Sequence, residues 1–148
     1  MTEPLALPVD TAGLVPHEGR MRMVDQLLSL DEESAVVSAC LPADGLLVAA
    51  ADGGLENVIY AELVAQAYAA YRGYELKALG LQPRAGYLVA IRQLDVLGRA
   101  KAGDTLIVTV RTVGVLDGFA VIAGDVSHGE NVLARAKLKV YIPEGDLT

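Results

Sequence analysis

The sequence predicts an α+β fold in which an antiparallel sheet wraps around one long central helix. Two observations lead to this prediction. One apolar stretch of helical length lies between residues 57 and 79, and from residue 86 onward the apolar residues recur with a period of two. A helix that is apolar on all sides must be covered, and a curled antiparallel sheet can cover it.

The segments before the helix are short. Residues 1–20 are expected to be irregular, because three prolines interrupt regular structure there. Residues 21–30 are predicted to form a strand, and residues 34–41 are predicted to be its hairpin partner. A loop rich in Gly, Ala and Asp follows at 42–56 and leads to the helix.

The predicted helix has a start signal and a stop signal. Asn57 is a suitable N-cap residue. The helix should end near Leu79, since Gly80 and then Pro83 follow it. Four tyrosines and six alanines lie between residues 57 and 79, and the tyrosines are expected to pack in the core and in a dimer interface. They are Tyr60, Tyr68, Tyr71 and Tyr74.

Four antiparallel strands are predicted after the helix. Residues 86–99 are long enough for one bent strand or two, and 105–116 is a run of β-branched residues. The Asp-Gly pair at 117–118 predicts a hairpin into 119–127, and a last strand is predicted at 132–142. Two strands, one helix and about four strands are the layout of the hotdog fold.

Length and composition fit one domain over residues 1–148. A hydrophobic content of 53% suggests additional surface that is buried in an oligomer, and we expect a homodimer. No apolar run reaches transmembrane length, and the first residues lack the basic segment of a signal peptide. Cys40, the single cysteine, excludes an internal disulfide and is predicted to be a small buried side chain. These features predict a cytoplasmic protein.

The net charge of −7 argues against binding to nucleic acid, and the charges are unevenly distributed. Residues 1–71 contain two basic and eleven acidic residues, whereas residues 72–148 contain ten basic and eight acidic ones. A basic surface in the second half would suit an acidic partner. Lys and Arg side chains that keep exposed strand edges from pairing with other chains explain the same charges equally well.

Glu62 and Gln66 are the only strongly polar side chains between Val58 and Ala70. They are four residues apart, so they lie on the same face of the helix. A carboxylate is almost never buried without a partner or a task, and burial favours its protonated form, which can donate a proton. Glu62 either has such a task or extends to the edge of the helix.

Several motifs resemble those of hotdog-fold 3-hydroxyacyl-[acyl-carrier-protein] dehydratase-like proteins of the aryl-polyene-cluster type. The segment 15–25 (VPHEGRMRMVD) is similar to the opening "PHxGxMxLLD", and Glu62–Gln66 (ELVAQ) is similar to the helix motif "ExxAQ". Residues 87–92 and 102–106 are similar to the strand motifs that follow. The resemblance covers about residues 13–142.

The resemblance implies dehydration of a 3-hydroxyacyl thioester on an acyl carrier protein to the 2-enoyl thioester, without metal or cofactor. Glu62 would be the acid and Gln66 would orient it. The backbone near Gly53, Gly54 and Val58 would approach the thioester, which is carried on the phosphopantetheine of the carrier protein.

The resemblance is incomplete at the expected base. Housekeeping dehydratases have a histidine in the loop before the helix, but residues 42–61 contain none. His128 is predicted to be a surface residue in a hairpin turn. His17 is then the candidate base, within one protomer or across a dimer, although a structural role in its loop explains it equally well. Two alternatives remain open: a hotdog acyl thioesterase and a non-catalytic hotdog partner subunit.

Overall fold

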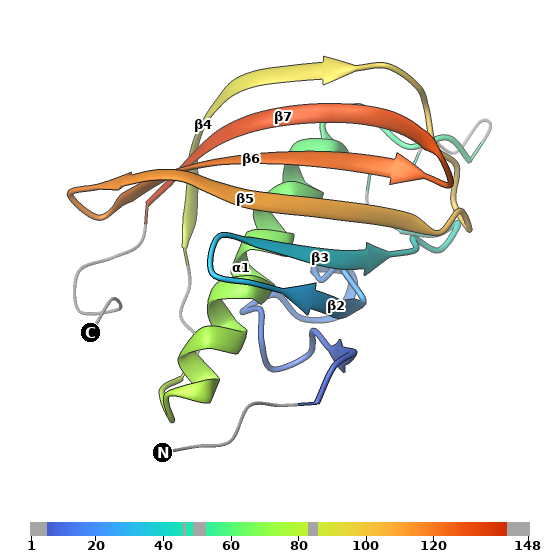
Figure 1. The fold of residues 1–148 in the computed structure, drawn as a ribbon. Coiled ribbons are helices and arrows are strands. Elements are labelled where there is room, and N and C mark those ends of the chain that lie inside the picture. Colours follow the sequence, from blue (N-terminus) through green and yellow to red (C-terminus); the bar gives the residue numbers. More distant parts are fainter. Residues whose placement is uncertain (1–5, 46, 49–52, 83–85, 142–148) are drawn as a thin grey trace.

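The computed structural model describes residues 6–45, 47–48, 53–82 and 86–141. These residues form one seven-stranded antiparallel sheet and one long helix (Figure 1). The order of the strands in the sheet is β1-β2-β3-β5-β6-β7-β4, so the strand that follows the helix lies at an edge. The elements are β1 (Val9–Asp10), η1 (Gly19–Met21), β2 (Gln26–Leu30), β3 (Ser34–Ala39), α1 (Ile59–Ala78), β4 (Tyr87–Val96), β5 (Leu106–Leu116), β6 (Phe119–His128) and β7 (Asn131–Tyr141).

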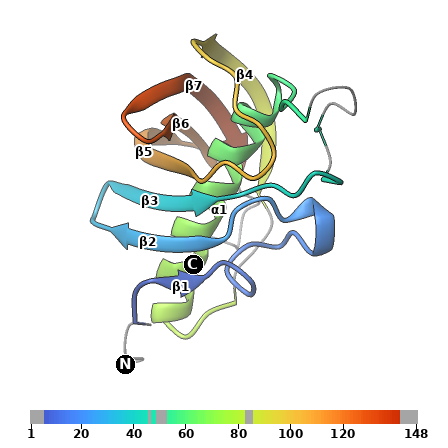
Figure 2. The ribbon, with the colours of Figure 1, turned by 90° about the vertical axis from the view of Figure 1, so that its right-hand side faces the viewer.

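The sheet curls around α1, which lies against its concave face (Figures 1 and 2). Alternate side chains of the strands are buried beneath the helix, as the period-two pattern predicted; Val108, Ile122 and Leu138 are examples from three neighbouring strands. Most of α1 is buried, including the four tyrosines, so the predicted core position of the tyrosines is confirmed. The predicted α+β hotdog architecture is therefore the observed one.

Small residues allow the helix to approach its neighbours closely. A Cβ atom at Gly124 of β6 would lie 2.6 Å from Val64 Cγ1, and one at Gly73 of α1 would lie 2.0 Å from the main-chain oxygen of Leu14. Neither position has room for a larger side chain. The chain before η1 thus packs directly against the helix backbone.

The first predicted strand begins later than expected. Gly19–Met21 form a turn of 3-10 helix, and β2 starts at Gln26 instead of residue 21. Hydrogen bonds to other parts of the chain hold the backbone between η1 and β2. Thr11 Oγ1 donates a hydrogen bond to the carbonyl of Val24 at 2.6 Å, and α1 binds the segment through Gln66.

Three local predictions differ from the structure. The N-cap residue of α1 is Val58 instead of Asn57, and it makes no side-chain capping bond. Residues 9–10 form the short strand β1 within the segment expected to be irregular. Cys40 is exposed, because β3 ends at the buried Ala39 and the next side chain points the other way.

In the described part of the chain, no helix has the length and apolar character needed to cross a membrane.

Candidate functional site

Glu62 lies in the first turn of α1, half-buried at the wall of a hollow of about 450 Å³. The described lining of the hollow is almost entirely apolar, and Glu62 is the one ionisable side chain among the described residues that line it. Its walls come from four separate parts of the chain, namely η1 and the residues after it, the loop near residue 47, α1 and the edge strand β4. The lining residues are Met21, Met23, Leu47, Val58, Ala61, Glu62, Gln66 and Leu88.

Gln66 is fully buried one turn along the helix and is fixed by three contacts. Its Oε1 accepts the main-chain N–H of Met23 at 2.7 Å, and its Nε2 donates to the carbonyl of Met21 at 2.7 Å. The same Nε2 lies 3.5 Å from Glu62 Oε2, a long hydrogen bond. The predicted pairing of Glu62 and Gln66 is therefore present, and Gln66 also joins the helix to the segment that carries the two methionines.

The N-terminus of α1 faces the same hollow through Val58. The main-chain N–H groups of Asn57 and Val58 have no hydrogen-bond acceptor among the described residues. Unpaired donors at a helix N-terminus attract negative charge. They provide a place where a partially negative carbonyl oxygen can be stabilised.

Gly53 and Gly54 occupy a different place from Val58. Gly54 is paired with Lys101 in an isolated antiparallel bridge, and the N–H of Ala102 donates to the carbonyl of Gly53 at 2.8 Å. A Cβ atom at Gly54 would lie 2.4 Å from the guanidinium carbon of Arg99. Gly54 thus allows the turn before β5 to pack against the chain that leads into α1, whereas a Cβ atom at Gly53 would meet nothing within 4 Å. Neither glycine is among the residues that line the hollow.

Tyr60 fixes the start of the helix to that turn, a role that the sequence did not reveal. The N–H of Ala100 donates to its hydroxyl at 2.9 Å, and the hydroxyl donates to the carbonyl of Gly98 at 3.0 Å. The N–H of Leu55 also donates to the carbonyl of Ala100 at 2.9 Å. Composition alone marks Tyr60 as a core residue, since only the tertiary structure brings residues 98–100 to its hydroxyl.

The two histidines differ in their surroundings. His17 is half-buried before η1, and its Nδ1 is buried without a hydrogen-bond partner among the described residues. It is not among the residues that line the Glu62 hollow, so its assignment as the base stays a prediction. His128 is exposed at the end of β6, with its Nδ1 3.9 Å from Asp104 Oδ2.

The hollow continues into an exposed apolar edge. Leu88 belongs both to its wall and to β4, the edge strand of the sheet. Further large apolar side chains are exposed along this edge and just beyond it, at Val89, Ile91, Val96 and Leu97. Unpaired edge strands with such side chains mark surfaces that another chain can cover.

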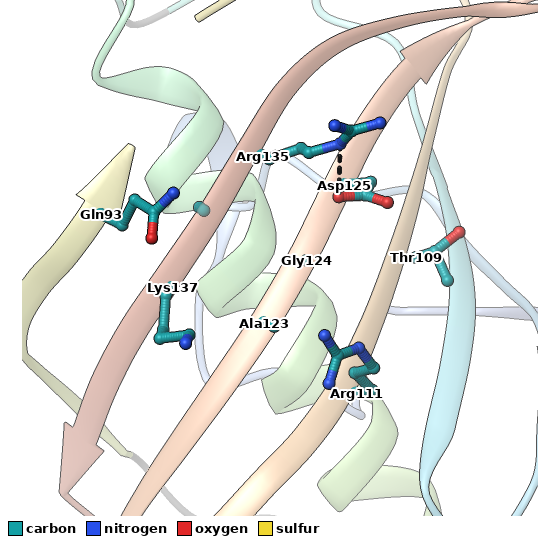
Figure 3. Close-up of a pocket in the computed structure, with 9 residues that line it drawn as sticks. Gln93, Thr109, Arg111, Ala123, Gly124, Asp125, Arg135 and Lys137 are labelled. Carbon is teal, nitrogen blue, oxygen red and sulfur yellow. Dashed lines mark ion pairs between the residues drawn. The ribbon is translucent and has the colours of Figure 1, made fainter. Parts of the chain in front are cut away.

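The outer face of the sheet, opposite to α1, is basic. Figure 3 shows Arg111 of β5 and Lys137 of β7 on either side of Ala123, above a shallow hollow of about 210 Å³. Arg135 lies beside them and pairs with Asp125 at 3.8 Å. Arg111 and Lys137 have no ion-pair partner within the part of the chain that the structure describes.

Comparisons with known proteins agree with this arrangement. The sequence model of the ApeP-like family, described as ApeP dehydratase, matches residues 9–148. The fold resembles the dehydratase heterocomplex ApeI:P from Xenorhabdus doucetiae, with a TM-score of 0.82, 21% identity and 93% of each chain covered.

More distant structures share the fold alone. The PaaI protein of the E. coli phenylacetic acid degradation operon has a TM-score of 0.58 at 22% identity, covering 78% of this chain and 80% of the other. A hypothetical thioesterase from Streptococcus pneumoniae, solved with coenzyme A, has a TM-score of 0.55 at 16% identity, covering 78% and 86%. A comparison with curated protein sequences gave no match. Since the family model spans nearly the whole sequence, the chain belongs to the ApeP-like dehydratase family.

Proposed function

We propose that this dehydratase removes water from a 3-hydroxyacyl thioester carried on an acyl carrier protein, in the synthesis of an aryl polyene or a related polyketide-like product. The observation that supports this proposal best is the position of Glu62. In a member of a dehydratase family, Glu62 is the one ionisable side chain among the described residues of an apolar hollow. It lies beside N–H groups of a helix N-terminus that have no acceptor in the described part of the chain.

In the proposed reaction a base removes the proton from C2 of the acyl group. The electron pair of that C–H bond forms the C2=C3 double bond while the C3–O bond breaks. Glu62 in its protonated form donates its proton to the departing hydroxyl group, which leaves as water. Negative charge that develops on the thioester oxygen is stabilised by the N–H groups of Asn57 and Val58.

His17 is the proposed base. An imidazole exchanges protons near neutral pH, and Nδ1 of His17 is not used in a structural hydrogen bond within the described chain. Because His17 does not line the Glu62 hollow of its own chain, its place in the reaction would depend on the other subunit of an assembly or on a substrate that extends to it.

We also propose that a second hotdog subunit closes the hollow at β4. A second subunit would bury the large apolar side chains that are exposed along this strand. We expect the interface to bury more than about 1,000 Å², as stable interfaces do. The related structure from Xenorhabdus doucetiae is a heterocomplex, so the partner is either a second copy of this chain or a related dehydratase subunit.

The basic outer face supports an acidic partner such as an acyl carrier protein. Arg111 and Lys137 lack ion-pair partners among the described residues, and they lie on two strands separated by β6. Charges arranged in this way accelerate association with an oppositely charged protein, and the effect weakens with ionic strength. This surface stands out because the whole chain has a net charge of −7.

The experiment that tests the function is incubation of the protein with a 3-hydroxyacyl carrier protein, followed by mass measurement of the acyl group. Loss of one water is the expected result. Hydrolysis to the free carrier protein would identify a thioesterase instead, and no change, with or without a partner subunit, would identify a non-catalytic subunit.

The role of Glu62 is tested by Glu62→Gln, which keeps the shape of the side chain. The rate should fall by a factor on the order of 10² to 10⁴, while the protein remains folded. Glu75→Gln is the matched control, since Glu75 lies on the same helix and pairs with Arg72 away from the hollow. An unchanged rate in Glu62→Gln would exclude Glu62 as the acid.

A further inference from the structure

The backbone of Leu47 has an unusual conformation at the wall of the Glu62 hollow. Its φ angle is +61°, in the left-handed region that branched side chains avoid. In the described part of the chain, one other non-glycine residue has a positive φ, namely Asp117 at +52°. Asp117 belongs to an Asp-Gly hairpin turn, where this conformation is normal. Leu47 and its neighbours in sequence, Leu-Leu-Val, contain no such Asp-Gly or Asn-Gly pair.

Neighbouring hydrogen bonds hold Leu47 in place. Its carbonyl accepts the N–H of Glu56, three residues before the start of α1, at 2.8 Å. The next residue, Val48, forms an isolated antiparallel bridge with Leu55. These contacts involve the backbone alone, so a glycine at position 47 would satisfy them equally well and without strain.

Leu47 is not a core residue. It is 38% exposed and does not belong to the cluster of buried hydrophobic residues. It does line the hollow together with Glu62, Met21 and Leu88. Strained backbone conformations are concentrated at active sites and ligand-binding sites.

We propose that Leu47 is a specificity-determining residue of the dehydratase. Its isobutyl group narrows the hollow beside Glu62, so that linear and flat acyl chains enter and chains with a bulky tetrahedral branch next to C3 are excluded. This inference rests on the proposed function, because it assumes that the acyl chain occupies the hollow.

The test compares two soluble thioesters of N-acetylcysteamine, 3-hydroxyhexanoyl and 3-hydroxy-4,4-dimethylpentanoyl. The second carries a tert-butyl group at C3. The kcat/KM for each is measured with the wild type and with Leu47→Ala and Leu47→Gly, with any partner subunit present. Both variants should raise the ratio of branched to linear kcat/KM by about tenfold or more, since single methylene differences in apolar pockets change specificity by this amount.

Thermal unfolding of the same variants measures the backbone strain at position 47 independently of the shape of the pocket. Leu47→Gly should unfold at a higher temperature than Leu47→Ala, because alanine keeps the unfavourable φ and glycine does not. Asp117→Gly is the matched control. It also removes a non-glycine residue with positive φ, but in a hairpin outside the hollow, so it should leave the ratio of kcat/KM unchanged.

The outcomes distinguish this inference from the proposed function. An active wild type whose selectivity stays within twofold in both Leu47 variants would overturn the inference alone. An equal change of selectivity in Asp117→Gly would also overturn it. A wild type that dehydrates neither thioester, and no carrier-protein substrate either, would overturn the function together with the inference.

Discussion

Gln66 accepts the main-chain N–H of Met23 at 2.7 Å, and this bond joins the buried helix to the segment between η1 and β2. The amide of Gln66 also donates to the carbonyl of Met21 at 2.7 Å. One side chain therefore satisfies a donor and an acceptor that no strand partner satisfies. It also positions the two methionines that form a wall of the Glu62 hollow.

Gln66→Leu should destabilise the fold substantially. The substitution leaves the buried N–H of Met23 without a partner, at a cost of about 1–3 kcal/mol, and it removes the part-buried bond to the carbonyl of Met21. Urea denaturation measures the change. Gln93→Leu is the control, because Gln93 is exposed on β4 and should change the free energy of unfolding by less than about 0.5 kcal/mol. Equal effects of the two substitutions would contradict the role of Gln66.

His17→Gln should abolish most of the dehydratase activity without unfolding the protein. Nδ1 of His17 makes no hydrogen bond among the described residues, so little stability should be lost, whereas a catalytic base contributes a rate factor on the order of 10² to 10⁴. Rates and thermal midpoints of the variant are compared with those of His128→Gln, an exposed histidine. If both variants keep full activity, the base lies elsewhere.

Light scattering at micromolar concentration should give the mass of a dimer. Ile91→Lys should shift the protein, or its complex with a partner subunit, towards monomer, because it places a charge within the exposed apolar edge of β4. Leu116→Lys is the control, since Leu116 is 74% exposed at the tip of the β5–β6 hairpin. A wild type that stays monomeric, alone and with related dehydratase subunits, would contradict assembly through β4.

Stability should fall between about pH 10 and pH 12 because of Tyr71. Burial is the main cause that raises the pKa of Tyr71 from 10.0 to about 12. The unfolded chain releases the phenolic proton near pH 10, while the folded chain retains it to about pH 12. The contribution of Tyr71 is therefore fully present below pH 10 and is lost as the pH rises through this range.

Tyr71→Phe provides the comparison for that prediction. The variant loses the hydrogen bond from the hydroxyl to the carbonyl of Glu32, 2.7 Å long, and should be less stable by about 0.5–1.5 kcal/mol at neutral pH. Its urea midpoint should depend less on pH above 10 than that of the wild type. Identical slopes for the two proteins would show that Tyr71 does not cause the alkaline loss.

The sequence by itself determined the fold class and the strand order along the chain. Apolar periodicity, turn residues and the length of one apolar helix are local properties, and each depends on residues close together in the chain. The isolation of Glu62 and its spacing from Gln66 were visible for the same reason. The helix boundaries were predicted to within two residues, although Val58 replaces Asn57 as the N-cap residue.

Only the tertiary structure decided which distant segments meet at the site. The walls of the hollow combine Met21, Leu47 and Leu88 with α1, and no local pattern relates these positions. The bonds from Gln66 to the segment before β2 and from Tyr60 to residues 98–100 also join parts that are far apart in the chain. The way the sheet curls around the helix decides which of these groups come within hydrogen-bonding distance. Local sequence does not specify the partners, because exchanging one hydrogen-bond partner for another changes the free energy little.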